Sequence, residues 1–166
     1  YRILVPWIAN GLNALDLPIH FSLWGWARMI ELISMVLVVY ATRSYVGLYL
    51  KDRRLTSILA FFVFLIVPFL FFYPRPYYAN YWFDTPAILF FTLGLTFLYQ
   101  KQWALYYVLF TVATLNRETT CFLTLAYLCT ALGREKISTI AAHCGAQFII
   151  WMTIKTAPKT AEEAVA

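Results

Sequence analysis

The chain is poor in charged residues: only 13% of its 166 residues are Asp, Glu, Lys or Arg, against about 25% in an ordinary soluble domain. Hydrophobic residues make up 62% of the chain, and the mean hydropathy is +0.68. They are grouped in long runs, close to the roughly 20 residues that an α-helix needs to cross a bilayer. This pattern excludes an ordinary soluble domain and predicts an all-α, polytopic transmembrane helix bundle.

Cysteine, histidine and glycine are too few or too scattered for several common kinds of site. The three cysteines, Cys121, Cys129 and Cys144, lie inside apolar runs, so we expect small buried hydrophobic residues and not disulfides. The two histidines, His20 and His143, have no second ligand at metal spacing, and we expect His143 to form an interhelical hydrogen bond. No glycine-rich phosphate loop and no basic stripe for nucleic acid are present. No cofactor is evident, although a divalent metal remains compatible with the carboxylates.

Apolar runs account for most of the chain. They are Phe21–Leu50, Leu55–Tyr73, Phe83–Tyr99, Trp103–Leu132 and Ile137–Ile154. The fourth run has about 30 residues, which fits either one long tilted helix or two short limbs of a hairpin. We therefore expect about five to six membrane segments.

The two ends of the chain differ from these runs. Residues 1–20 contain two asparagines, a glycine and two prolines, so we expect an N-terminal helix that lies in the membrane interface. Residues 155–166 form a polar tail that we expect to fray. Residues 1–154 then form a single transmembrane domain, which we expect to be part of a longer chain.

Basic residues occur in alternate connections, which predicts the topology. Lys51, Lys101 and Arg134 mark three connections that the positive-inside rule places in the cytoplasm. All three share that side only if Trp103–Leu132 is a hairpin, and its turn is then residues 116–119. The single tilted helix is the alternative, and it would put Arg134 outside.

The polar tetrapeptide Asn116-Arg117-Glu118-Thr119 interrupts this hairpin run. Charges at membrane depth are kept where they face protein, water or the surface. Arg117 suits a phosphate, because its guanidinium fork matches phosphate oxygens, and Glu118 could act as a base. The alternative is that both residues pair with Asp84 or another group and only hold the hairpin, with Asn116 and Thr119 as helix caps.

The remaining candidate residues precede or lie apart from this turn. Asp84 follows an aromatic-rich segment and precedes Pro86, so it fits a helix cap or a catalytic carboxylate. Tyr78 and Trp82 could stack on a sugar, although most aromatic residues here fit an interfacial belt better. Arg28 and Glu31 are three residues apart and can pair on one helix face.

Three segments together carry a family resemblance. The opening Tyr1–Pro6, the segment Phe83–Pro86 and the segment Thr114–Thr119 resemble polytopic bacterial membrane proteins of the GT-C glycosyltransferase type. The resemblance implies a transferase that uses a polyprenyl-phosphate-linked sugar at the periplasmic or lumenal face. That family usually carries an early catalytic acid, and Asp16 is the only early acid here.

These observations lead to two functional hypotheses. The first is a glycosyltransferase-like protein of the bacterial inner (plasma) membrane, with Asp84 and Glu118 as candidate catalytic carboxylates. Arg117, Asn116, Tyr78 and Trp82 are then its candidate substrate-binding residues. The alternative is a non-catalytic integral-membrane subunit that packs within a larger complex. The expected partners are membrane lipid, a polyprenyl-phosphate sugar and other membrane subunits, and not nucleic acid.

Overall fold

The computed structural model describes residues 3–15, 21–72 and 84–163, and within these ranges the chain is helical and has no strand. Its helices follow one another in the order α1 (Leu4–Ala14), α2 (Leu23–Val46), α3 (Arg53–Phe72), α4 (Asp84–Tyr99), α5 (Trp103–Asn116), the short 3-10 helix η1 (Glu118–Thr120), α6 (Cys121–Ala131) and α7 (Ile137–Glu163). The predicted all-α class is therefore confirmed for the described part of the chain.

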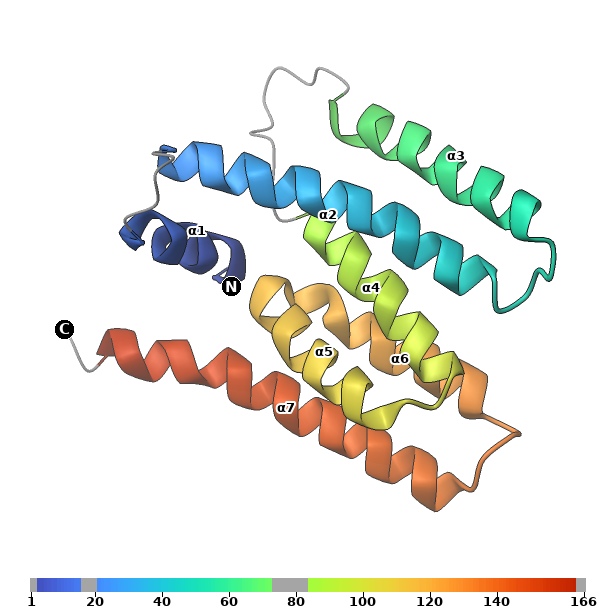
Figure 1. Cartoon of the computed structure of the whole chain (residues 1–166). Coiled ribbons are helices and arrows are strands. Elements are labelled where there is room, and N and C mark those ends of the chain that lie inside the picture. The colour runs from blue at the N-terminus through green and yellow to red at the C-terminus, as the bar shows by residue number, and fades with distance from the viewer. Residues whose placement is uncertain (1–2, 16–20, 73–83, 164–166) are drawn as a thin grey trace.

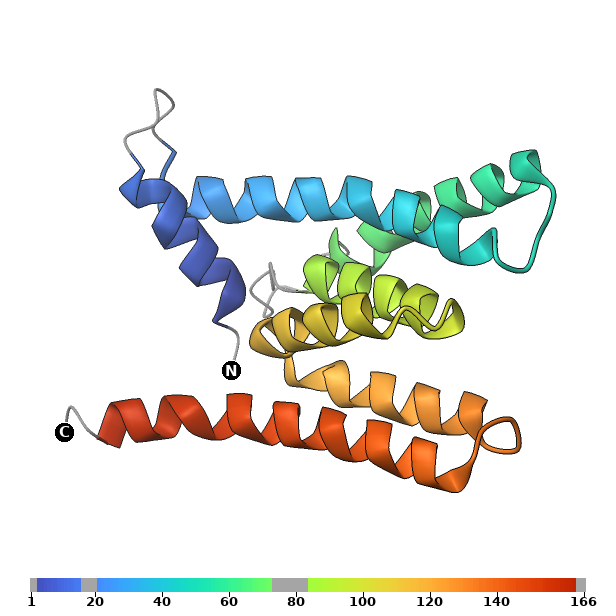
Figure 2. The same ribbon diagram turned by 60° about the horizontal axis from the view of Figure 1, so that its bottom comes forward.

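The long helices lie side by side in a stack that runs from α3 through α2, α4 and the α5–α6 pair to α7 (Figures 1 and 2). α1 crosses this stack at a steep angle near one end (Figure 2). α1 packs against α2 and is tied to the end of α5 by a hydrogen bond from the Ile3 N–H to the Leu115 carbonyl (3.2 Å).

Among the described residues, two helices are long and apolar enough to cross a membrane, namely α2 and residues Ile137–Thr156 of α7. Only 17% of the first span and 11% of the second is buried inside the protein, whereas the core helix of a soluble protein is mostly buried. α4 and α5 are shorter apolar helices of 16 and 14 residues. The structure thus supports membrane-crossing helices without settling the expected number of five to six.

Small residues allow the helices to approach one another closely, as is common in membrane proteins. Ala27, Ala41 and Ala113 are almost fully buried. A Cβ atom added at Gly94 of α4 would lie 2.8 Å from a methyl group of Leu123 in α6. A larger residue at position 94 would therefore force the buried Leu123 side chain to shift.

The chain reverses direction between α5 and α6, as the hairpin interpretation predicted. The ring of Trp103, at the start of α5, lies 5.3 Å from the ring of Tyr127, near the end of α6. Tyr106 and Phe110 of α5 pack in one core cluster with Leu123 of α6. α6 therefore runs back along α5, and the single long helix is excluded.

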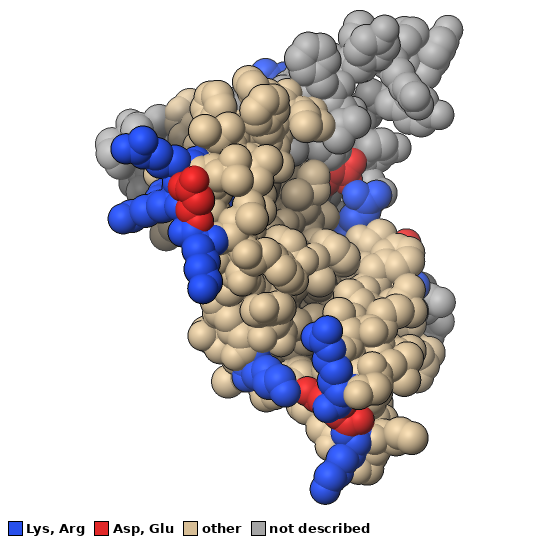
Figure 3. Space-filling model, turned by 90° about the vertical axis from the view of Figure 1, so that its right-hand side faces the viewer, with Lys and Arg blue, Asp and Glu red and all other residues tan. Residues whose placement is uncertain are grey.

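The three basic connections meet at one end of the bundle. Tyr49, between α2 and α3, contacts the Tyr99 ring at the end of α4 (5.1 Å between centroids). Lys101 Nζ lies 2.9 Å from Glu135 Oε1, which joins the α4–α5 connection to the α6–α7 connection. Hydrogen bonds from Lys101 and, to a smaller extent, from Tyr127 lower the pKa of Glu135 below its ordinary value. Figure 3 shows that Lys and Arg gather in groups on this end of the molecule.

This shared end gives a prediction about topology. In a variant with the three cysteines replaced by alanine, Arg54→Cys and Lys136→Cys should react with an impermeant thiol reagent from the same side of sealed vesicles. Glu118→Cys should react from the opposite side, since it lies at the other end of α5 and α6. Labelling of positions 118 and 136 from one side would contradict the predicted topology.

The expectation that the three cysteines are buried was wrong. Cys121 and Cys129 are free but exposed, because they lie on the face of α6 that points away from the bundle, and Cys144 is partly exposed. In the segment expected to be a polar tail, α7 continues to Glu163. Alanine and glutamate in this segment favour helix, which accounts for the continuation.

Candidate functional site

The polar turn between α5 and α6 is held by its own hydroxyl groups. The Thr114 and Thr120 hydroxyl oxygens lie 3.1 Å apart within hydrogen-bond distance, and the Thr120 hydroxyl donates to the Arg117 carbonyl (3.0 Å). Arg117 itself is extended, with φ −155° and ψ 140°. An extended residue between two helical segments turns the Arg117 side chain away from the axis of α5 and toward α4.

Arg117 forms a salt bridge with Asp84, in which Nη1 donates to Oδ1. The expectation that Arg117 has an acidic partner is therefore confirmed. Asp84 is the first residue of α4, and Pro86 lies in the first turn of that helix, where proline is tolerated. The Asp84 side chain is 18% exposed and the Arg117 side chain is 31% exposed, so both residues of the pair are only partly buried.

A cavity of about 350 Å³ opens beside this pair. Its wall is charged where Asp84 and Arg117 lie, and the rest is mainly apolar apart from Thr92 and Thr119. The lining residues are Asp84, Ala87, Ile88, Phe91, Thr92, Arg117, Thr119 and Phe122. A cavity with one charged edge and aromatic walls can accept a ligand that joins a charged group to an apolar part.

Glu118 does not join Asp84 and Arg117 in this cavity. Its carboxylate pairs with Lys155 of α7 at 2.9 Å, and its side chain is 58% exposed. Lys155 also lies over the Trp151 ring, 4.6 Å from the centroid, and Trp151 Nε1 donates to the Glu118 carbonyl (3.2 Å). Glu118 therefore connects the turn to α7, while its neighbour Arg117 connects the turn to α4.

The other predicted site residues are divided between the interior and the undescribed parts of the chain. Asn116 is fully buried at the end of α5, so it supports the turn from inside and does not line the cavity. Tyr78 and Trp82 lie outside the described residues, and so does Asp16. Thr119 lies within η1 and lines the cavity, and neither η1 nor α6 has a side-chain cap hydrogen bond at its start.

Sequence reasoning missed the part that α2 plays at this end of the protein. α2 packs against α4, and Glu31 is close enough to Arg28 and Asp84 to be influenced by their charges, so a carboxylate of α2 lies near the Asp84–Arg117 pair. The spacing of Arg28 and Glu31 predicted only an interaction between these two residues. In the described part of the chain they do not form a salt bridge within 4.0 Å, since the ion pairs involve other residues.

A second polar cluster lies between α5 and α7, away from the cavity. The Tyr107 hydroxyl lies 2.7 Å from His143 Nδ1, which confirms the interhelical hydrogen bond expected for His143. The indole of Trp103 stacks on the imidazole with 3.8 Å between ring centroids, and the Tyr106 hydroxyl donates to Gln147 Oε1 (3.0 Å). This cluster fastens α7 to the hairpin.

The described residues contain no group of three or more His, Cys, Asp and Glu side chains that could hold a metal ion. No family model, no curated protein and no solved structure matches the chain. The geometry of the Asp84–Arg117 cavity is therefore the basis for a functional interpretation.

Proposed function

We propose that the chain is a membrane-embedded, glycosyltransferase-like protein of the bacterial inner membrane that acts on a polyprenyl-phosphate-linked sugar at the non-cytoplasmic face. In this proposal the chain is a bundle of five to six membrane segments with α1 in the interface. The observation that carries the proposal is the cavity lined by Asp84 and Arg117, at the end of the bundle opposite the basic connections.

The chemistry of this cavity suits a lipid-linked phosphate. Arg117 has five N–H donors, and its hydrogen bond to Asp84 uses Nη1, so the remaining donors can bind phosphate oxygens. Phe91 and Phe122 provide apolar wall on the same cavity, which fits the first part of a polyprenyl chain. A single cavity can thus hold the charged and the apolar part of such a donor.

A direct transfer needs one group to take a proton and another to neutralise the leaving phosphate. The Asp84 carboxylate would deprotonate the acceptor hydroxyl as it attacks the sugar, and Arg117 would stabilise the phosphate that leaves. Glu118 is the weaker candidate for the base, because its carboxylate is engaged with Lys155 of α7 and does not line the cavity.

The alternative proposal is a non-catalytic subunit of a larger membrane complex. It is supported by the pairing of both charged residues of the turn, Arg117 with Asp84 and Glu118 with Lys155, which a purely structural role would also produce. Large apolar side chains such as Leu32, Ile33 and Val36 are also exposed along α2. They would face lipid in the first proposal and could face another subunit in the second.

The two proposals predict different results with the purified chain in detergent. If the first is correct, the wild-type chain binds a short-chain polyprenyl-phosphate sugar, and Asp84→Asn abolishes transfer to an alcohol acceptor while binding persists. The asparagine keeps a hydrogen bond to Arg117 but is no base. Absence of both binding and transfer in the folded wild-type chain would favour the subunit proposal.

A further inference from the structure

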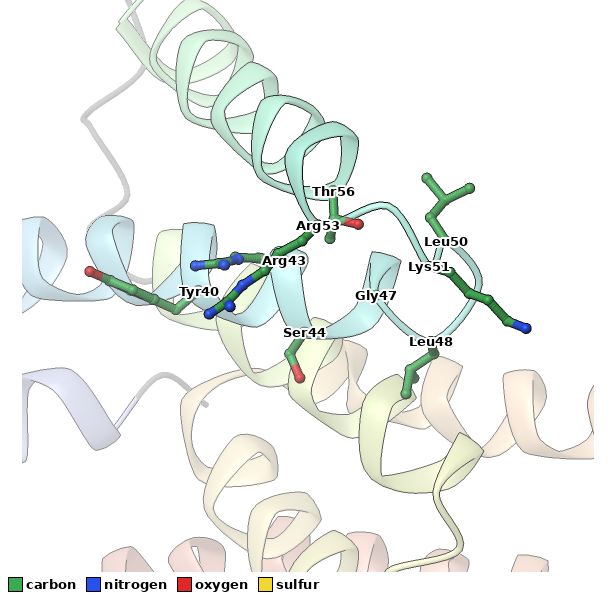
Figure 4. Close-up of a pocket in the computed structure, with 9 residues that line it drawn as sticks. All are labelled: Tyr40, Arg43, Ser44, Gly47, Leu48, Leu50, Lys51, Arg53 and Thr56. Atoms are coloured by element: carbon green, nitrogen blue, oxygen red, sulfur yellow. The ribbon is translucent and has the colours of Figure 1, made fainter.

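A second cavity lies at the opposite end of α2, where this helix turns into α3. It has a volume of about 500 Å³. Its wall combines the last turns of α2, the connection and the first turn of α3 (Figure 4), and its lining residues are Tyr40, Arg43, Ser44, Gly47, Leu48, Leu50, Lys51, Arg53 and Thr56. Nothing in the proposed transferase chemistry uses this cavity.

Two arginines from different helices lie together at this cavity. The side chains of Arg43 in α2 and Arg53 in α3 run alongside each other and extend in the same direction, toward Tyr40 (Figure 4). Lys51 points the other way (Figure 4). The positive charge of the cavity is therefore concentrated in one pair of guanidinium groups.

Neither arginine forms a salt bridge with a carboxylate of the described residues. The acid nearest in sequence, Asp52, is engaged elsewhere: its Oδ1 accepts hydrogen bonds from the backbone N–H groups of Arg54 (2.8 Å) and Leu55 (3.4 Å). The Asp52 carboxylate thus caps the start of α3 and forms no salt bridge with the arginine pair.

Like charges held side by side repel each other, and an anion between them converts the repulsion into attraction. Guanidinium groups fit the oxygens of a phosphate group with two parallel hydrogen bonds each. Arg43 is partly buried and comes from the final turn of α2, so its guanidinium is partly withdrawn from solvent. A charge that is partly withdrawn from solvent is screened less by salt than an exposed charge, so Arg43 attracts an anion more strongly than a free surface charge does.

From this geometry we propose that the α2–α3 turn binds a phosphate group between Arg43 and Arg53. The turn lies at the end of the membrane-crossing helix α2, together with the other basic connections (Figure 3). This is the level at which phospholipid headgroups occur. The same chemistry also suits a soluble phosphate, so both sources are tested.

The test measures binding of two probes to the full chain in neutral detergent. The probes are short-chain phosphatidic acid and inorganic phosphate, each followed by the shift in thermal unfolding temperature during a titration. Arg43→Gln and Arg53→Gln should each weaken the binding roughly fivefold to tenfold. Arg54→Gln removes the same charge from the neighbouring, exposed residue that does not line the cavity, and it should change binding less than about twofold.

The outcomes separate the sources and decide the proposal. Sensitivity to Arg43 and Arg53 with phosphatidic acid alone supports a lipid headgroup, and the same sensitivity with inorganic phosphate supports a soluble ligand. Equal loss in all three variants would mean diffuse attraction to a basic surface and would overturn the site. No binding of either probe by the wild-type chain would overturn it as well. Arg53 is exposed, so Arg53→Gln keeps the test valid even if Arg43→Gln fails to fold.

Discussion

Arg117→Lys is expected to lose roughly tenfold to hundredfold in turnover of a polyprenyl-phosphate sugar, with the amount of folded protein unchanged. Lysine keeps the positive charge but replaces the planar fork with a single ammonium group. Hydrogen bonds to charged groups contribute about 1.5–3 kcal/mol each, and the phosphate would lose at least one. The measurement is transfer from the donor, normalised to folded protein in detergent.

A matched control is available on the other side of the same turn. Lys155→Arg also exchanges one cation for another in a salt bridge, but its partner Glu118 does not line the cavity. This variant should keep turnover within about twofold of the wild type. Unchanged turnover in Arg117→Lys would remove the phosphate role and leave Arg117 as a structural partner of Asp84.

The pairing of Arg117 could be predicted from sequence because an unpaired charge at membrane depth is expensive. Asp84 was one partner considered for Arg117, with another group left open, and only the fold selects it: the extended backbone at Arg117 turns the side chain toward the start of α4. The pairing of Glu118 with Lys155 was not predicted. It needs α7 to pass beside the turn and to stay helical beyond residue 155, and both depend on tertiary packing.

The helix hairpin could be predicted from charge, since three basic connections share one side only if the chain reverses near residue 117. The cavity could not, because it is formed where Phe91 and Thr92 of α4 face Phe122 of α6. No local sequence pattern fixes the distance between α4 and α6 at this point. It is set by the close contact of Gly94 with Leu123 two to three residues further along α4.

The packing of α6 explains why Cys121 and Cys129 are exposed although the sequence predicted buried cysteines. α6 places Leu123 and Tyr127 toward the bundle, so Cys121 and Cys129 lie on the opposite, outward face. In a soluble protein an apolar cysteine is usually buried by protein. In a helix that contacts lipid, an apolar residue is favourable both on the face that packs on protein and on the face that contacts lipid. Hydropathy alone therefore does not indicate which face a residue lies on.

Removing one partner of the Asp84–Arg117 pair should destabilise the protein more than removing both. Asp84→Ala leaves Arg117 as a partly buried cation without its carboxylate. For a fully buried pair such a loss costs about 3–5 kcal/mol. The side chains here are 18% and 31% exposed, so we expect about 1–3 kcal/mol, which is the range for one unsatisfied buried group. Thermal and denaturant unfolding in detergent would measure the change.

The double variant Asp84→Ala/Arg117→Ala then separates the structural part of the pair from its chemical part. Its loss of stability should fall short of the sum of the single losses by about 1 kcal/mol or more, because no charge remains unpaired. A transferase would still lack turnover in the double variant even where stability recovers, since both the base and the phosphate-binding group are gone. A subunit would recover function along with stability. If the loss of stability in the double variant equals the sum of the losses in Asp84→Ala and Arg117→Ala, the two residues do not depend on each other for folding, and the salt bridge has no structural role.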